Sequence, residues 1–319
     1  MAVPLQNGHE SNWLTFGPIQ LHLSRKLAVR YSVQKLGEYT LRGLEMGKKY
    51  DSLGDRMKGY ENIARNYLTR RIPVIIRVDG KAFHTFTKGM EKPFDRILMT
   101  TMQNTMKYLC ENIQGCVFGY TQSDEITLVL TDYATITTDA WFGYNIQKMC
   151  SVSASMATLA FSNAYAAELW KNFPDAMRSS DKGTNKYIET LVAKMGTAMF
   201  DARVFSIPKD EVSNCLIWRQ QDATRNSIES VGQANFSHKE LQGKSCNAIQ
   251  EMLWKDCGIN WNDYPVDCKR GASCFKAMVR EDVPIFNNTA TVEVHRNRWV
   301  IDRETPIFSQ EREYIERWL

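Results

Sequence analysis

The sequence predicts an α+β fold, because a buried strand, an amphipathic helix and a β-hairpin follow one another along the chain. The chain has 319 residues, a length that suits one large domain or two closely packed ones. With 43% hydrophobic and 24% charged residues, it has the composition of an ordinary globular protein. The positions of these elements also determine which charged side chains lie at strand ends.

The first strand is expected at Val74 to Val78, an apolar run broken only by Arg77 and followed at once by Asp79 and Gly80. The helix is expected to open with Pro93 in its first turn, where the fixed φ of proline is favourable. Its apolar residues recur at helical spacing and are Phe94, Leu98, Met102, Met106, Leu109 and Ile113.

The hairpin is predicted from two β-rich runs, 116–120 and 126–130, which flank the polar turn 121–125. Helices are expected next at 141–171 and 181–199, and a further strand at 200–208. A helix should follow, with Asp210 as its N-cap. From about residue 255 on, the sequence predicts loops and short strands.

Charge and cysteine content narrow the class of protein only slightly. The net charge of +4 is a mild basic bias that is compatible with a polyanionic partner. The eight cysteines lack zinc-knuckle spacing, so we expect reduced thiols in an intracellular protein. No apolar run approaches the roughly 18 residues of a membrane span, so no membrane partner is expected.

Residues 1–50 differ from the rest of the chain. Between Ser11 and Gly37 there is no acidic residue, whereas basic residues are interspersed among apolar ones. Two interpretations remain open: an organelle-targeting segment, or an extension that carries no address.

Carboxylates follow the first strand and occupy the hairpin turn. If this strand lies beside the hairpin, Asp79 and Asp124 come from neighbouring strand ends, and a hard divalent cation would relieve their repulsion. Mg²⁺ suits such a pair, and Gly80 would let the backbone approach a ligand. Taken alone, Asp79-Gly80 is more often a turn, and Ser123-Asp124-Glu125 is more often a hairpin tip or a cap. Their combination with a strand, a helix and a hairpin favours phosphoryl-transfer chemistry.

Basic and aromatic residues follow this first carboxylate. Lys81, Lys88 and Lys92 are near enough in sequence to neutralise a triphosphate, and Phe83 and His84 are flat groups that could stack on a base. The alternative interpretation is that the lysines are solvated on the surface and that His84 is a packed or surface histidine.

Several separated motifs resemble those of the tRNA(His) guanylyltransferase superfamily, the 3′–5′ polymerases. They are "IRVDGKAFHTF", "KPFD", "GYTQSDEITLVL", "WRQQDATRNS", "GINWNDYP" and "KRG", in order from about Asp51 to Gly271. The resemblance implies a polymerase-like palm with a ferredoxin-like βαββ core, flanking helices and a C-terminal extension. The implied domains are an extension at 1–50, a catalytic domain at 51–275 and the C-terminal extension at 276–319.

In this family the 5′-phosphate of a tRNA is first activated by a nucleotide, and the 3′-hydroxyl of an incoming NTP then attacks it. The resemblance implies Mg²⁺ held by Asp79, Gly80 and Asp124, with Glu125 as a supporting catalytic residue. It implies that GTP or ATP is bound by Gly80, Lys81, Ala82, Phe83, His84, Lys92, Asp95 and Ser123. The residues implied near the tRNA 5′ end are Arg219, Gln220, Asp222, Asn226, Lys269 and Arg270.

One element departs from the eukaryotic family pattern. Those members carry His-Ile-Asn-Asn where this chain has Thr224-Arg225-Asn226-Ser227. The departure is similar to the bacterial and archaeal like-protein branch, whose members restore missing 5′ nucleotides of tRNA opposite a template. The resemblance therefore favours tRNA 5′-end repair over the obligatory extra guanosine on tRNA(His). It also implies a homotetramer, in the cytoplasm unless residues 1–50 direct the chain to an organelle.

Two other functions remain open. A palm with paired carboxylates also serves nucleotide cyclases and dinucleotide synthases, which act on NTPs without RNA. A non-catalytic tRNA-binding protein could keep the same scaffold, but it would have no reason to retain two mutually repelling carboxylates.

Overall fold

The computed structural model describes residues 52–174, 185–284 and 291–319. The chain divides into two compact units, with the boundary after Ile63. In the first, the structure describes helix α2 (Ser52–Ile63). The second, Ala64–Leu319, holds every other described element. The predictions for residues 1–50 lie outside the described residues. Within the described ranges, no helix is both long enough and apolar enough to cross a membrane.

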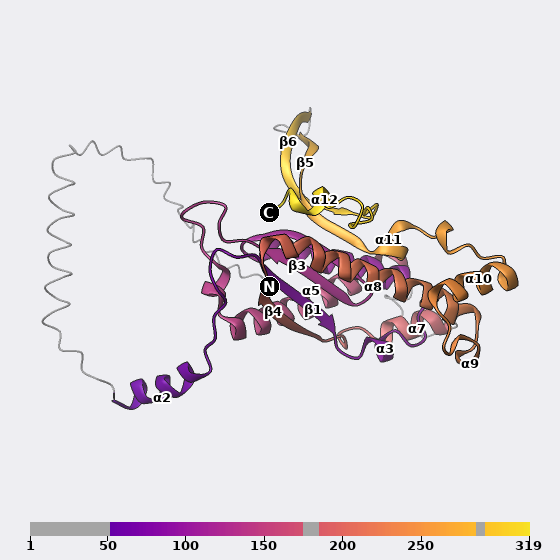
Figure 1. Ribbon diagram of the computed structural model, residues 1–319, viewed down its shortest axis with the longest axis horizontal. Coiled ribbons are helices and arrows are strands. Elements are labelled where there is room, and N and C mark those ends of the chain that lie inside the picture. The colour runs from indigo at the N-terminus through magenta and orange to yellow at the C-terminus, as the bar shows by residue number, and fades with distance from the viewer. Residues whose placement is uncertain (1–51, 175–184, 285–290) are drawn as a thin grey trace, which may run out of the picture. The chain divides into compact units, whose positions relative to one another are not determined.

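The second unit is built on an antiparallel sheet (Figure 1). Its strand order is β4-β1-β3-β2-β5-β6. Helix α4 (Arg96–Asn112) connects β1 to β2, and helix α5 (Ile146–Asn172) connects β3 to β4. This βαββαβ order, with strands arranged 4-1-3-2, is the ferredoxin-like topology, so the predicted α+β class and core are confirmed. The strands are β1 (Val74–Gly80), β2 (Cys116–Gln122), β3 (Glu125–Leu130), β4 (Phe200–Ser206), β5 (Ala272–Pro284) and β6 (Thr291–Asp302).

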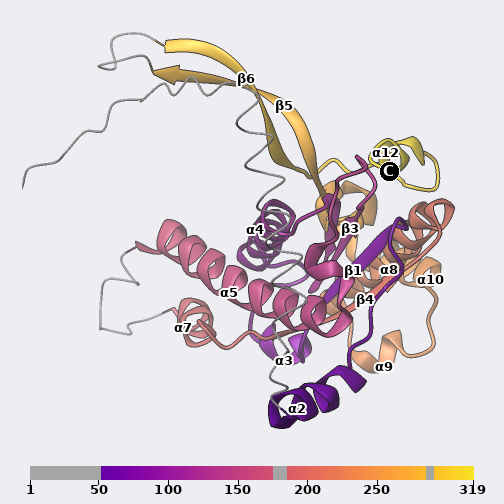
Figure 2. The ribbon, with the colours of Figure 1, turned by 90° about the vertical axis from the view of Figure 1, so that its left-hand side faces the viewer.

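Helices cover both faces of the sheet, and β1 is buried between them. Figure 2 shows α4 and α5 on one face and α8 (Lys209–Asn235) on the other. Val74, Ile76 and Val78 pack in the cluster with α4 and α5, whereas Ile75 packs with α8. Because side chains alternate along a strand, Asp79 lies on the same face as Ile75, the face that α8 covers.

Three helices begin or end differently from the prediction. Helix α4 begins at Arg96, after Pro93, because the Asp95 carboxylate accepts a hydrogen bond from the Leu98 N–H and caps the helix. Helix α8 begins after Pro208, so Asp210 lies in its first turn rather than at the N-cap. Helix α7 (Lys186–Ala193) ends short of Met199, and its predicted start at Asp181 lies outside the described residues.

The region after residue 255 is more regular than predicted. Strands β5 and β6 form a long hairpin that pairs from Ser273 with Asp302 to Pro284 with Thr291. Beyond Cys274, no residue of β5 up to Glu281 is buried, so the apolar alternation that reveals a strand is weak. The predicted domain boundary at 275 falls inside β5, which runs through it without a break.

The remaining elements are short, apart from α10. They are α3 (Phe83–Phe86), η1 (Trp141–Tyr144), α9 (His238–Leu241), α10 (Cys246–Cys257), η2 (Trp261–Asp263), α11 (Val266–Arg270) and α12 (Glu313–Glu316). The predicted helix at 141–171 is thus a 3₁₀ turn followed by α5.

Gly271 joins α11 to β5 in a conformation that other residues avoid, with φ 75° and ψ −171°. A Cβ there would lie 2.3 Å from the carbonyl oxygen of Thr121. We expect Gly271→Ala to lower the free energy of unfolding by about 3 kcal/mol, measured by urea denaturation. The control is Gly258→Ala: φ is also positive, 67°, but no atom lies within 4 Å, so about 1 kcal/mol is expected. Equal losses would contradict this account.

Candidate active site

The sheet register brings the two predicted carboxylates together. Asp79 pairs with Glu125 across β1 and β3, and the Gly80 N–H donates to the carbonyl of Asp124 at 3.1 Å. The predicted juxtaposition of Asp79 and Asp124 at neighbouring strand ends is therefore confirmed.

The hairpin turn is tighter than predicted. Only Ser123 and Asp124 lie between β2 and β3, so the predicted five-residue turn is wrong. Ser123 has a φ of 50°, and its hydroxyl donates to the Asp124 carboxylate at 3.0 Å. A turn of this length leaves Asp124 little freedom and holds it beside the end of β1.

The charges at this edge fit a hard cation. Burial, and secondarily the charge of Asp79, raises the pKa of Asp124. In the described part of the chain, Asp124 has no ion pair, whereas Asp79 lies 3.7 Å from Arg203. No group of three or more potential metal-ligating side chains occurs among the residues described. A cation here would thus depend on two carboxylates, backbone carbonyls and water, a donor set that Mg²⁺ accepts.

The Glu125 carboxylate contacts helix α8. Its carboxylate forms an ion pair with Arg219 at 2.8 Å, and only 10% and 7% of the two side chains remain exposed. Burial raises the pKa of Glu125, and Arg219 opposes the shift. The side chain therefore ties the hairpin to the helix and acts as a positioning residue.

Phe83 belongs to the core. Its side chain is 4% exposed and packs against Phe86, Phe161 and Phe200. The interpretation of Phe83 as a base-stacking group is wrong. A Cβ on Gly80 would lie 2.3 Å from the Phe83 ring, so close packing, rather than ligand approach alone, requires glycine there.

The turn after Gly80 presents backbone donors. Ala82 is left-handed, with a φ of 55°, and the chain enters α3 immediately after it. The N–H groups of Ala82, Phe83 and His84 donate to no acceptor among the described residues. Successive unpaired N–H groups in such a turn can bind an anion. The side chains of Lys81 and His84 are exposed beside them.

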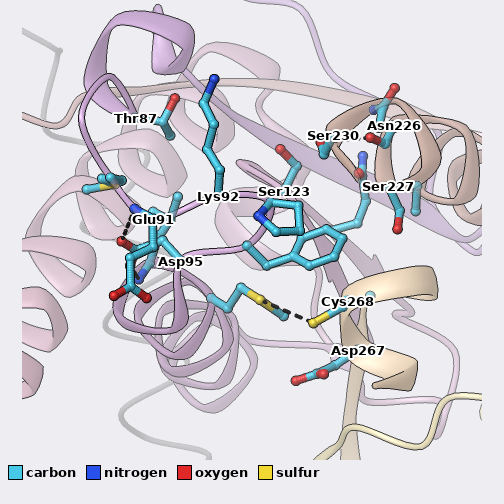
Figure 3. A pocket seen from close by; sticks show the side chains of 18 of the residues that line it. Thr87, Glu91, Lys92, Asp95, Ser123, Asn226, Ser227, Ser230, Asp267 and Cys268 are labelled. Carbon is cyan, nitrogen blue, oxygen red and sulfur yellow. Dashed lines mark hydrogen bonds between the residues drawn. The ribbon is translucent and has the colours of Figure 1, made fainter. Parts of the chain in front are cut away.

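A cavity of about 260 Å³ opens next to the hairpin turn. Figure 3 shows the loop residues Lys92 and Thr87 on one side and Asn226 and Ser230 of α8 on the other, with Ser123 also facing it. The family resemblance assigns Lys92 and Ser123 to the nucleotide and Asn226 to the tRNA 5′ end. All three line this one cavity.

Several predicted site residues are engaged within the protein. The Asp95 carboxylate accepts from the N–H groups of Glu91 and Leu98 and from the Tyr187 hydroxyl, so it shapes the loop that lines the cavity. The Gln220 carboxamide is bound at both ends by the main chain of Pro306 and Phe308.

Lys269, Asp222 and Arg270 differ in how open they are to a ligand. The Lys269 ammonium donates to the Asn262 carbonyl, and burial lowers its pKa. Asp222 is paired with Arg219. The Arg270 Nε donates to the Thr305 carbonyl at 3.4 Å, but the side chain also lines a groove.

Two residues on β4 were missed by the sequence analysis. Asp201 pairs with Asp79 across β1 and β4, and Arg203 lies 3.3 Å from Asp201 and 3.7 Å from Asp79. The sequence holds a signal for both, because Asp201 and Arg203 alternate along the predicted strand at 200–208 and must share one face.

Comparison with known proteins gives one consistent family. Residues 54–208 match the family model of tRNAHis guanylyltransferase. The tRNA(His) guanylyltransferase of Saccharomyces cerevisiae is 27% identical, over 62% of this chain and 80% of that one. An uncharacterized protein of Acanthamoeba polyphaga mimivirus is 28% identical, over 73% and 80%.

Solved structures extend the match. A bacterial tRNA(His) guanylyltransferase-like protein in complex with ATP is 43% identical, with a TM-score of 0.68 over 83% of this chain and 98% of that one. Such a protein in complex with GTP is 41% identical, with a TM-score of 0.60 over 84% and 99%. The crystal structure of the tRNA(His) guanylyltransferase from Saccharomyces cerevisiae shares the fold. That protein is 22% identical, with a TM-score of 0.51 over 74% of this chain and 95% of that one.

The ion pair between Glu125 and Arg219 gives a stability prediction. Arg219→Ala leaves the Glu125 charge buried without a partner, so we expect the free energy of unfolding to fall by about 3–5 kcal/mol in urea denaturation. Arg225→Ala is the matched control, because this arginine also pairs with Asp222 but is 59% exposed. Its loss should be below about 1 kcal/mol. Similar losses in both variants would refute the role given to the buried pair.

Proposed function

Because the chain belongs to the tRNA(His) guanylyltransferase family, we propose that it is a nucleotidyltransferase that adds nucleotides to the 5′ end of tRNA. The observation that carries the proposal is the placement of Asp79 and Asp124 at adjacent strand ends, beside a turn with unpaired backbone donors and a cavity. The names of the solved relatives, which include complexes with ATP and GTP, support nucleotides as substrates.

Different parts of the site would bind the base and the phosphates of the nucleotide. The cavity beside Lys92 and Asn226 has room for a base. The N–H groups from Ala82 to His84, with the exposed ammonium of Lys81, would receive the phosphates. Asp79, Asp124 and the Gly80 carbonyl would hold Mg²⁺, which supplies neutralisation of phosphate charge in such reactions.

The reaction proposed is 3′–5′ addition. The 3′-hydroxyl of an incoming NTP gives its proton to water and attacks the activated 5′-phosphorus of the RNA. The bond between that phosphorus and the activating group breaks, and the activating group leaves with the electron pair. Asn226 and Arg270 are the proposed RNA-facing residues that remain open to a ligand. Arg219 and Glu125 hold the hairpin and α8 at a fixed distance while this occurs.

We propose repair of truncated tRNA as the physiological role. Thr224-Arg225-Asn226-Ser227 stands where eukaryotic members carry another motif, and the bacterial like-protein relative at 43% identity supports the same branch. The proposal includes a cytoplasmic homotetramer, whose mass light scattering would measure.

The carboxylate pair gives an activity prediction. Asp79→Asn and Asp124→Asn should each lower nucleotide addition to a 5′-truncated tRNA by about 1,000-fold, because both keep the shape of the site but lose a negative charge that would hold Mg²⁺ against the phosphates. tRNA binding, measured by filter retention, should change by less than about threefold. Asp210→Asn, an exposed carboxylate in the first turn of α8, is the control and should retain full activity.

Thermal unfolding separates the metal from the chemistry. Mg²⁺ should raise the Tm of the wild type and of Asp210→Asn but not of the two site variants, because binding to the folded state alone stabilises it. A Tm that rises with Mg²⁺ in Asp124→Asn as it does in the wild type would overturn the assignment of that ligand.

Repair requires that the opposing base select the nucleotide. With truncated tRNAs that differ only in the template base, the complementary NTP should be added about 10- to 100-fold faster than the others. The measurement is single-turnover addition with each NTP, from 5′-monophosphate and 5′-triphosphate RNA. Addition of G regardless of the opposing base would exclude repair, and product formed from NTPs alone would favour a nucleotide cyclase or dinucleotide synthase.

A further inference from the structure

A groove of about 780 Å³ lies along a different face of α8 from the cavity beside Ser123. The helix contributes Trp218, Gln221 and Arg225 to the groove, at three- and four-residue spacing, whereas Asn226 and Ser230 face the cavity. Helix α8 therefore separates two hollows, and of the residues that line the groove only Arg270 has a part in the proposed function.

The groove combines aromatic rings with positive charge. Its walls include Trp218, Trp261, Arg225 and Arg270, and none of the residues described as lining it is acidic. The Trp218 side chain is 48% exposed, which is unusual for so large an apolar group. Flat rings beside guanidinium groups suit the bases and phosphates of single-stranded nucleic acid.

The two tryptophans are held in place by the protein. The indole N–H of Trp261 donates to the Ser227 hydroxyl at 3.0 Å. The Arg219 guanidinium lies 3.6 Å from the centroid of the Trp218 ring, and Arg77 lies 5.4 Å from it. Because both rings are already positioned, a base that stacks on them would not have to order them first.

The groove adjoins the candidate active site through two short connections. Arg219, next to Trp218, pairs with Glu125, which follows Asp124 in the hairpin. Arg270 lines the groove, and the next residue, Gly271, lines the cavity. A strand of RNA that leaves the active site could thus enter the groove without crossing the molecule.

We propose that this groove binds the unpaired 3′-terminal nucleotides of tRNA, with at least one base stacked on Trp218. The proposal rests on the proposed function, which places the tRNA 5′ end at Asp79 and Asp124. In any tRNA the single-stranded 3′ tail continues from the strand that pairs with the 5′ end, so the tail emerges beside the active site. An aromatic, positively charged groove there matches its chemistry.

The test uses a 5′-phosphorylated RNA hairpin that mimics an acceptor stem, with a short unpaired 3′ tail, and two further versions. One is blunt, and the other carries abasic sugars in the tail. For the wild-type protein, we expect the blunt and abasic RNAs to bind about 10-fold more weakly than the tailed RNA in fluorescence anisotropy. Trp218→Ala should bind all three within about twofold, and Trp218→Tyr should restore the preference.

Matched controls separate this groove from general effects. Trp254→Ala removes another exposed tryptophan, 64% exposed on α10, and should keep the preference for the tail. Gln221→Glu adds a charge in the groove without changing its shape, and should weaken tailed RNA most at low salt. Gln242→Glu, at an exposed position outside the groove, should not. Gln221→Glu keeps the test informative if Trp218→Ala does not fold.

The outcomes distinguish this inference from the proposed function. If the wild type adds nucleotides to the 5′ end but binds tailed and blunt RNA equally, the groove proposal is wrong and the proposed function stands. A preference for the tail that persists in Trp218→Ala would also overturn it. If the tail is preferred through Trp218 but no nucleotide is ever added, the groove is an RNA site and the proposed function is wrong.

Discussion

The ion pair between Glu125 and Arg219 joins the two structural parts on which the site depends, the β2–β3 hairpin and α8. The hairpin turn carries Asp124, and α8 carries the residues that line the cavity and the groove. Removal of two charges from water opposes most of their attraction, so such a pair adds little net stability, although loss of one partner is costly. Its value here is that a sheet edge and a helix keep one relative position.

Helix α8 organises what a ligand would meet on either side. Asp222, one turn after Trp218, pairs with both Arg219 and Arg225, so a single carboxylate links the buried arginine to an exposed one. A change on the groove face can therefore reach the residue that supports the hairpin. The network thus runs from the groove, which Arg225 lines, to Glu125 in the β2–β3 hairpin.

The sequence predicts the core of this arrangement because the relevant signals are local. The apolar run before Asp79 and the two β-rich runs around Asp124 indicate three strands, and the family resemblance implies the topology that joins them. The individual roles of Phe83 and Gln220 could not be predicted in this way. Phe83 is buried by Phe161 and Phe200, far away in sequence, and Gln220 is bound by the main chain after β6. Sequence alone does not show which side chains a distant segment will cover.

The β5–β6 hairpin shows what can favour a pairing where few residues are buried, since beyond its packed base near Trp299 most of its described side chains are exposed or half-buried. In the strands that helices cover on both faces, a slip by one residue would exchange the side chains of the two packed faces, and the two cores prevent it. Beyond Cys274 that restraint is weak, and ionic contacts take its place: Arg298 and Arg296 lie 2.6 Å and 3.6 Å from Glu281, and Arg280 lies 2.7 Å from Glu293. A slipped alignment would separate these partners. Charge therefore adds to the backbone ladder in favouring this register, and that contribution weakens as ionic strength rises, unlike the packing of the strands beneath the helices.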